Sequence, residues 1–273
     1  MRFSVIALCV MLGCATFASG ASAQGAPVAG ETPGTIHVFN GKDLTGLYKW
    51  VKDRGRDNDP KDVFTVKDGL LRISGEELGC VTSTDEFENF HLIMEFKWGE
   101  KTWAGRKDAA RDSGMLVHST GEDGAYSGIW MHSIECQMIE GGTGDLLVVG
   151  DSTDNFHLTA LTAPELDKNC GVYKPGGQPR TITSGRINWW GRDPEWQDVK
   201  GFRGKQDVEK PIGEWNRYEC IAQGDKITVL LNGVTVNAAF DVKPSRGRIQ
   251  IQSEGAELFV RRVDVVPLAA AAK

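Results

Sequence analysis

The segment from residue 130 to residue 140 carries the side chains best suited to chemistry, in the order Trp-Met-His-Ser-Ile-Glu-Cys-Gln-Met-Ile-Glu. In a β-strand alternate residues share a face, so Glu135 and Gln137 project to the same side, about 7 Å apart. The apolar residues between and beside them project to the other side, where we expect the protein core. A bulge after Gln137 would bring Glu140 onto the same face as Glu135. The strand therefore predicts an outer face that carries a carboxylate and an amide.

A carboxylate and an amide beside aromatic rings are the groups that bind carbohydrates. Carboxylates and amides hydrogen-bond to sugar hydroxyls, and an aromatic face packs on the C–H side of a sugar ring. Trp130 directly precedes the strand, and residues 169–210 add Trp189, Trp190 and Trp196. Two interpretations stay open at this point: a carbohydrate cleft, or a solvated strand face with tryptophans that belong to the core.

Short β-type patterns separated by turn residues must position this segment. Asp68-Gly69 and Asn232-Gly233 each separate two apolar runs, which indicates two hairpins. We find no long window with helical periodicity. The strands predicted from these patterns span residues 63–66, 70–73, 90–98, 113–119, 133–139, 215–223, 226–231, 234–236, 248–252 and 259–266.

These strands predict an all-β fold, an antiparallel β-sandwich of the jelly-roll type. Nothing divides residues 36–268, so we expect one domain there. The sequence has no self-similar repeat of fixed period, which argues against a propeller or a solenoid. Two polar, glycine-rich stretches, residues 99–112 and 169–210, are predicted as long loops, where sites are often built.

Composition excludes several classes of protein. The 273 residues include 33 glycines, 25 % charged residues and 40 % hydrophobic residues, which argues against wholesale disorder. The formal net charge of −6 argues against a nucleic-acid-binding protein, which needs a basic face. No apolar stretch after the N-terminal segment is long enough to span a bilayer.

The first 23 residues have the features of a secretory signal peptide. A basic start precedes the apolar run from Phe3 to Phe17, and Ala21-Ser22-Ala23 is a small-x-small cleavage site. We expect cleavage after Ala23 and a periplasmic or secreted mature protein. Residues 24–35 are then a flexible leader and residues 269–273 a short tail.

Four cysteines remain in the predicted mature chain: Cys80, Cys136, Cys170 and Cys220. They allow three pairings, and the sequence does not choose among them. One disulfide is compatible with export. Cys136 and Cys220 each lie within an apolar strand pattern, which is equally typical of small core residues.

Several motifs occur in the order found in a known family. The residues from Val38 to Gly46 resemble the opening "LFNGKDLTGW" of the DUF1080 family, now described as 3-keto-disaccharide hydrolases or 3-keto-glucoside lyases. Asp112-Ser113-Gly114 resembles its "NSG" strand, which ends in a His or Arg at the position of His118. The remaining matches are Trp130 to Gln137, Trp215-Asn216, Leu231-Asn232-Gly233, Ile251 to Gly255 and Arg261-Arg262-Val263.

The resemblance implies a concanavalin-like jelly roll with the Glu-x-Gln strand on its concave face. This chain departs from the family pattern at several positions: Asp112 replaces the usual Asn, Arg262 replaces an Asn, and Glu140 lies where Asp is common. These differences leave the preferred substrate open.

The resemblance also implies a mechanism. A ketone at C3 of a glycoside acidifies the proton at C2, so the glycosidic bond can be cleaved by elimination, followed by hydration. Glu135 is then the candidate base, and His118 the candidate general acid or enolate stabiliser. Gln137, Trp130, Asp112 and Glu140 are candidate substrate-binding residues. Arg261 is expected to stabilise negative charge, with Glu254 orienting it.

Three further possibilities accompany this prediction. A divalent metal is possible because Glu135, Gln137, His118 and Asp112 offer oxygen and nitrogen ligands. A conventional glycosidase would instead use Glu135 and Glu140 as its two carboxylates. A sugar-binding module without activity is compatible with the same fold.

Overall fold

The computed structural model describes residues 32–164 and 169–270. The predicted signal peptide, most of the predicted leader and the last three residues of the tail lie outside the described residues. From Gly34 onward the chain forms one compact unit, with strands from Ile36 to Pro267. None of the helices in residues 32–164 and 169–270 is both long enough and apolar enough to cross a membrane.

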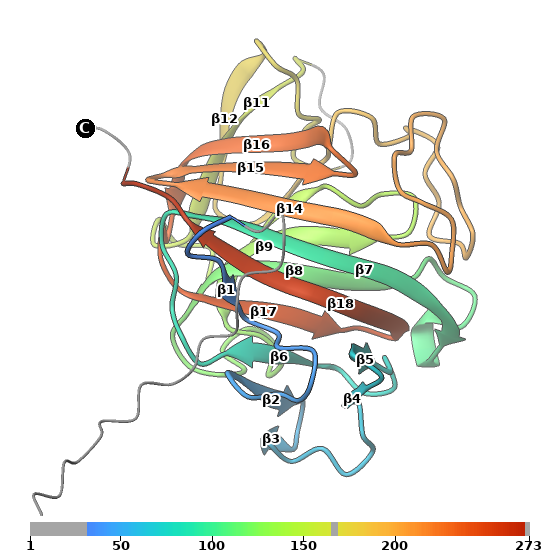
Figure 1. The fold of residues 1–273 in the computed structure, drawn as a ribbon. Helices are drawn as coiled ribbons and strands as arrows, with labels where there is room; N and C mark the ends of the chain where they lie inside the picture. The colour runs from blue at the N-terminus through green and yellow to red at the C-terminus, as the bar shows by residue number, and fades with distance from the viewer. Residues whose placement is uncertain (1–31, 165–168, 271–273) are drawn as a thin grey trace, which may run out of the picture. The chain divides into compact units, whose positions relative to one another are not determined.

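The described strands form two antiparallel sheets, seen as successive layers in Figure 1. The larger sheet has ten strands, nine of them in the order β12 (Gln178–Ile182), β11 (His157–Thr162), β16 (Val234–Lys243), β15 (Lys226–Leu231), β14 (Asn216–Gln223), β7 (Phe90–Thr102), β18 (Ala256–Pro267), β5 (Leu70–Ile73) and β4 (Phe64–Lys67), with β1 (Ile36–His37) paired to β18. The eight-stranded sheet runs β13 (Gly185–Ile187), β10 (Leu146–Val149), β9 (His132–Ile139), β8 (Asp112–Thr120), β17 (Arg248–Ser253), β6 (Gly79–Ser83), β2 (Leu47–Val51) and β3 (Gly55–Arg56).

Both predicted hairpins are present, and backbone geometry explains them. Asp68 and Gly69 have φ values of 52° and 79°, and Asn232 and Gly233 have values of 51° and 82°. Positive φ at both central residues matches the twist of the flanking strands. The turns therefore fix the register of β4 with β5 and of β15 with β16.

The core lies between the two sheets and follows the alternation expected for β9. Ile134, Cys136 and Met138 are fully buried in it, together with Met94 and Tyr218 from the opposite sheet. The Tyr218 hydroxyl crosses the layer and donates a hydrogen bond to the Gln137 carbonyl, at 3.0 Å. Because the apolar side chains of β9 face inward, Glu135 and Gln137 face outward, as predicted.

Part of the predicted loop over residues 169–210 is in fact strand. Gln178–Ile182 forms β12 at the edge of the larger sheet, and Gly185–Ile187 forms β13 at the edge of the smaller one. Edge strands are mostly exposed and tolerate proline, so neither shows the alternation by which strands are recognised. The sequence patterns also missed β1, β2, β3, β6, β10 and β11, which are short or lack alternation.

All four predicted mature-chain cysteines are free thiols. Cys136 and Cys220 are fully buried core residues, one from each sheet, in agreement with the second interpretation of these positions. Cys80 is also fully buried, but it packs against Leu116, Ile129 and Trp130 in a separate apolar cluster.

We predict that Gly69→Ala lowers the free energy of unfolding by about 1 kcal/mol, because an alanine at φ 79° is strained although no atom lies near its Cβ. Gly105→Ala is the matched control, since its Cβ also meets open space and its φ is not in the left-handed region. Urea unfolding of both variants measures the difference. Equal effects of the two substitutions would contradict this account of the turn.

Candidate functional site

The candidate site lies on the outer face of the eight-stranded sheet, where β9, β8 and β17 run side by side. Gly114 of β8 pairs with Gln137 of β9. On the other side of β8, Gln250 of β17 pairs with Leu116. Because the two strands are antiparallel, Gln252 lies opposite Gly114. Two glutamines therefore flank a glycine on one rung of the sheet.

Gly114 leaves the space that the neighbouring polar groups occupy. A Cβ at this position would overlap Glu135 Oε1 and Gln252 Oε1. Both oxygens therefore lie over the glycine backbone, where no other residue type would leave room. The carboxylate of Glu135 and the amide of Gln252 are brought together because Gly114 has no side chain.

Asp112 lies at the start of β8, on the same outer face. It accepts a hydrogen bond from Gln137 Nε2 at 3.0 Å and forms an ion pair with Arg106. Arg106 also contacts Asp198 at 2.8 Å. The two predicted loop regions thus meet at this end of the site, since Arg106 belongs to one and Asp198 to the other.

A third carboxylate, Glu254, directly follows β17. Its strongest charge interactions are with Asp112, Glu135, Arg106 and Arg186. Arg186 comes from β13, and its guanidinium contacts the fully buried Asp145 at 3.3 Å. Asp145 also pairs with Arg192 and accepts a hydrogen bond from the Trp189 backbone. A buried carboxylate therefore holds the second long loop, and Arg186 with it, against the edge of the sheet.

Burial raises the pKa of each of the three carboxyl groups. Glu135 is only 4 % exposed, and its pKa rises to about 8. Loss of hydration is the larger cause, and the charge of Asp112 is the second. Loss of hydration also raises the pKa of Asp112 to about 7, although Arg106 and Arg186 oppose the rise. The pKa of Glu254 rises well above its ordinary value for the same reason, aided by the other two acids.

Several amide atoms in this cluster have no hydrogen-bond partner in the described part of the chain. They are Gln137 Oε1 and both polar atoms of the Gln252 side chain. Buried polar atoms are normally paired with protein, water or ligand. The unpaired amide atoms beside Glu135 are therefore available to hydrogen-bond with a polar ligand.

An apolar patch adjoins the polar cluster on the same face. Cys80 pairs with Gln252 across β6 and β17, and with Trp50 on its other side. Trp130 packs into this patch, donates from its indole nitrogen to the Gly79 carbonyl and stacks on Tyr126 with an interplanar angle of 23°. Trp130 therefore lies on the same face as the acids, but it is largely buried.

His118 does not lie with Glu135, which corrects the prediction for this residue. A register shift near the end of β8 and a φ of 54° turn its side chain toward the other sheet. The imidazole is 1 % exposed and packs edge-on against Phe90, with ring centroids 5.6 Å apart. Burial lowers its pKa to about 4, so it is neutral at physiological pH.

Glu140 does not join Glu135 either. The pairing of β8 with β9 stays regular from Val117 opposite Ile134 to Asp112 opposite Ile139, so no bulge turns Glu140 onto the outer face. Its carboxylate instead forms a buried ion pair with Arg111 at 2.8 Å. That pair anchors the end of β9 to the loop before β8.

Arg261 lies on the opposite sheet, which corrects its predicted role. It is on β18, its side chain is 45 % exposed, and it contacts Glu95 at 2.6 Å and lies over the Trp215 ring. Glu254 therefore cannot orient Arg261. Arg106 and Arg186 supply the positive charge of the site instead.

Three contributors to the site were not predicted from the sequence: Arg106, Arg186 and Gln252. The alternation of β17 would have placed Gln252 on the same face as Glu254, because the two residues are two positions apart. No sequence signal identifies either arginine, although both lie in or beside the long polar stretches expected to build a site. Among residues 32–164 and 169–270, no group of three or more His, Cys, Asp or Glu side chains is placed to hold a metal ion.

We predict that Asp112→Asn lowers the pKa of Glu135 from about 8, because the Asp112 charge is one of the causes that raise it. Titration of the Glu135 carboxyl carbon by NMR measures the shift. Asp85→Asn, a change at an exposed position before β7, should leave that titration where it is. An unchanged or higher pKa in Asp112→Asn would show that the two carboxyl groups do not interact.

A Parabacteroides distasonis structure, named as a provisional glycosyl hydrolase, shares 16 % identity with a TM-score of 0.51, covering 86 % of this chain and 94 % of its own. A second structure from that organism with a similar description shares 19 % identity at a TM-score of 0.47, covering 86 % and 99 %. Bacillus licheniformis β-glucanase shares 13 % identity at a TM-score of 0.45, covering 86 % and 99 %. No curated protein matches the chain.

The first of these likenesses shows the fold, a jelly-roll sandwich, as predicted. A family model for the 3-keto-alpha-glucoside-1,2-lyase-like domain matches residues 34–266, nearly the whole described unit. That match supports a carbohydrate-active function and agrees with the motif resemblance in the sequence. The chain belongs to the 3-keto-alpha-glucoside-1,2-lyase-like domain family.

Proposed function

We propose that this protein cleaves 3-keto-glycosides by removing the proton at C2 and eliminating the group attached at C1. The observation that carries the proposal is the position of Glu135: a desolvated carboxyl on the outer face, beside two further acids and two glutamine side chains with unpaired amide atoms. Membership of the family supports the choice of a keto sugar as substrate.

In the first step, ionised Glu135 takes the proton from C2, and the electron pair of that C–H bond moves toward the C3 ketone to form an enolate. A raised pKa makes Glu135 a stronger base than an exposed carboxylate. Arg106 and Arg186, which both act on this cluster, stabilise the negative charge that develops on the enolate oxygen.

In the second step, the enolate collapses, the bond from C1 to the leaving oxygen breaks, and that oxygen takes a proton. Glu254 is the proposed donor, because burial and the charges of Asp112 and Glu135 raise its pKa and so favour its protonated form. Water then adds to the C1–C2 double bond, with hydroxide bound at C1 and a proton at C2. Glu135 returns the C2 proton, and Glu254 accepts the proton released by the water.

Gln137 and Gln252 are proposed to bind sugar hydroxyl groups. The unpaired amide atoms of these residues provide both an acceptor and a donor next to Glu135. Because Gln137 also donates to Asp112, the direction of its amide is fixed before a ligand arrives. A conventional pair of glycosidase carboxylates is disfavoured, because Glu140 is committed to its buried ion pair with Arg111.

We predict that Glu135→Gln lowers kcat/KM for a 3-keto-glucoside by at least ~100-fold, because the variant cannot accept the C2 proton. The wild-type protein should not cleave the parent glucoside, which lacks the ketone. Release of the aglycone measures both reactions. Glu219→Gln, a change to another largely buried carboxyl on the opposite sheet, is the matched control and should keep activity.

Two results would sink the proposal: equal cleavage of the keto sugar and the parent glucoside, or full activity in Glu135→Gln. Binding of keto sugars without turnover in the wild-type protein would instead favour a sugar-binding module.

We predict that kcat/KM rises with pH from pH 5 to about pH 8. A base acts in its ionised form, and the ionised fraction of Glu135 falls about tenfold for each pH unit below its pKa of about 8. Initial rates at low substrate concentration from pH 5 to pH 9 measure the profile. Activity that is highest at low pH and falls through pH 8 would assign Glu135 the role of an acid instead.

The proposed substrate is encountered outside the cytoplasm if residues 1–23 act as a signal peptide, as we propose from their apolar run and cleavage site. Expression in a Gram-negative host should yield a mature protein whose N-terminus is Gln24. Mass spectrometry of the purified protein measures this. A protein that retains Phe3 to Phe17 and stays in the cytoplasm would contradict export.

A further inference from the structure

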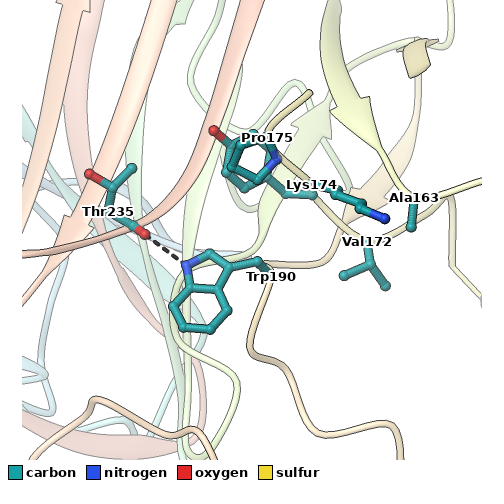
Figure 2. Close-up of a pocket in the computed structure, with 7 residues that line it drawn as sticks. Ala163, Val172, Lys174, Pro175, Trp190 and Thr235 are labelled. Carbon is teal, nitrogen blue, oxygen red and sulfur yellow. Dashed lines mark hydrogen bonds between the residues drawn. The ribbon is translucent and has the colours of Figure 1, made fainter. Parts of the chain in front are cut away.

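A pocket of about 470 Å³ lies apart from the carboxylate cluster. Its walls come from four separate segments: Ala163 just after β11, residues 172–175, Trp190 after β13, and Thr235 on β16. Figure 2 shows Trp190 with Thr235 on one side and with Lys174, Val172 and Ala163 on the other. None of them belongs to the cluster around Glu135.

Backbone hydrogen bonds hold the walls of the pocket in place. Ala163 N donates to the Val172 carbonyl at 2.9 Å, and Lys174 N donates to the Leu161 carbonyl at 2.8 Å. Tyr173 N donates to the Asn188 carbonyl, also at 2.8 Å, which joins this wall to the segment that carries Trp190. The pocket is therefore formed before any ligand binds, as small-molecule sites usually are.

Trp190 is an exposed but fixed aromatic surface. The residue is 37 % exposed, although tryptophan is usually much more buried. Its indole nitrogen donates to the Thr235 carbonyl at 2.8 Å, the dashed line in Figure 2. Its ring also packs edge-on against the buried Trp189, with centroids 5.4 Å apart. The ring is held in one orientation while part of it remains open to a ligand.

The pocket's polar side chains have free hydrogen-bonding groups. Within the described residues, the Lys174 ammonium, the Tyr173 hydroxyl and the Thr235 hydroxyl form no hydrogen bond or ion pair with another group. All three can donate, and no carboxylate lines the pocket. Val172 and Pro175 complete an otherwise apolar wall. The pocket thus suits a ring with an apolar face and many acceptor oxygens.

We propose that this pocket is a second, non-catalytic carbohydrate-binding site, in which a pyranose ring packs on Trp190. The axial C–H groups of the sugar would contact the indole, and its hydroxyl and ring oxygens would accept hydrogen bonds from Lys174, Tyr173 and Thr235. A site of this kind binds the sugar chain that surrounds the cleaved bond, or a neighbouring chain, without taking part in the reaction. It does not depend on the elimination mechanism.

The test is calorimetric titration of the mature protein with cellotetraose, maltotetraose and chitotetraose. A Glu135→Gln background prevents turnover, so only binding is measured. We expect at least one saccharide to bind, and Trp190→Ala to weaken that binding about tenfold, which matches the loss of one good aromatic contact. Trp190→Phe should recover part of the affinity because it keeps an aromatic face.

Trp215→Ala is the matched control. Trp215 is another partly exposed tryptophan that directly precedes β14, does not line the pocket and lies in contact with Lys97 and Arg261. Binding should be unchanged in this variant. Cleavage of a small 3-keto-glucoside should also be unchanged by Trp190→Ala in the otherwise wild-type protein, which separates this site from the catalytic one.

Three outcomes would overturn the proposal. The first is the absence of binding by all three saccharides. The second is binding that Trp190→Ala leaves intact although thermal unfolding shows the variant folded. The third is an equal loss of binding in Trp190→Ala and Trp215→Ala, which would show a general effect of removing a tryptophan.

Discussion

The candidate site depends on the cost of burying carboxyl groups where little water reaches them. Glu135 and Asp112 are nearly inaccessible, so loss of hydration raises the pKa of both, and the charge of Asp112 raises the pKa of Glu135 further. Arg106 and Arg186 offset part of this cost. The balance leaves carboxyl groups that exchange protons near neutral pH, a property typical of groups that act in acid–base catalysis.

Two buried acids outside the cluster hold the second long loop, which carries Arg186, against the sandwich. Asp145, fully buried, fastens Arg186 and Arg192 to the edge of the smaller sheet. Glu209, in the second long loop, accepts hydrogen bonds from Trp98 and from Thr143, in the turn after β9. Burial raises the pKa of Glu209 to about 7. The second long loop is therefore attached to the sandwich by ionisable groups in its interior, and this attachment places Arg186 at the site.

The residues of β9 illustrate what alternation can and cannot predict. Glu135 and Gln137 were placed correctly because an apolar set must face the core, and in a strand this decides the direction of every second side chain. His118 was placed in the site by the family resemblance, and that expectation was wrong because the irregular end of β8 turns this side chain toward the other sheet. For Glu140 regular alternation holds: β9 has no bulge after Gln137, so its carboxylate stays off the outer face and pairs with Arg111.

The sequence by itself determined the all-β class, both glycine turns, the outward direction of Glu135 and Gln137, and the family resemblance. These features follow from local backbone preferences, from two-residue periodicity and from motifs that are contiguous in the chain. Only the tertiary structure decided that Gln252 and Glu254 meet Glu135 over Gly114, that Arg106 and Arg186 replace Arg261, and that Trp190 is exposed beside Thr235. Such contacts join residues far apart in the sequence, and the packing of loops against the sheets, which no local pattern encodes, brings them together.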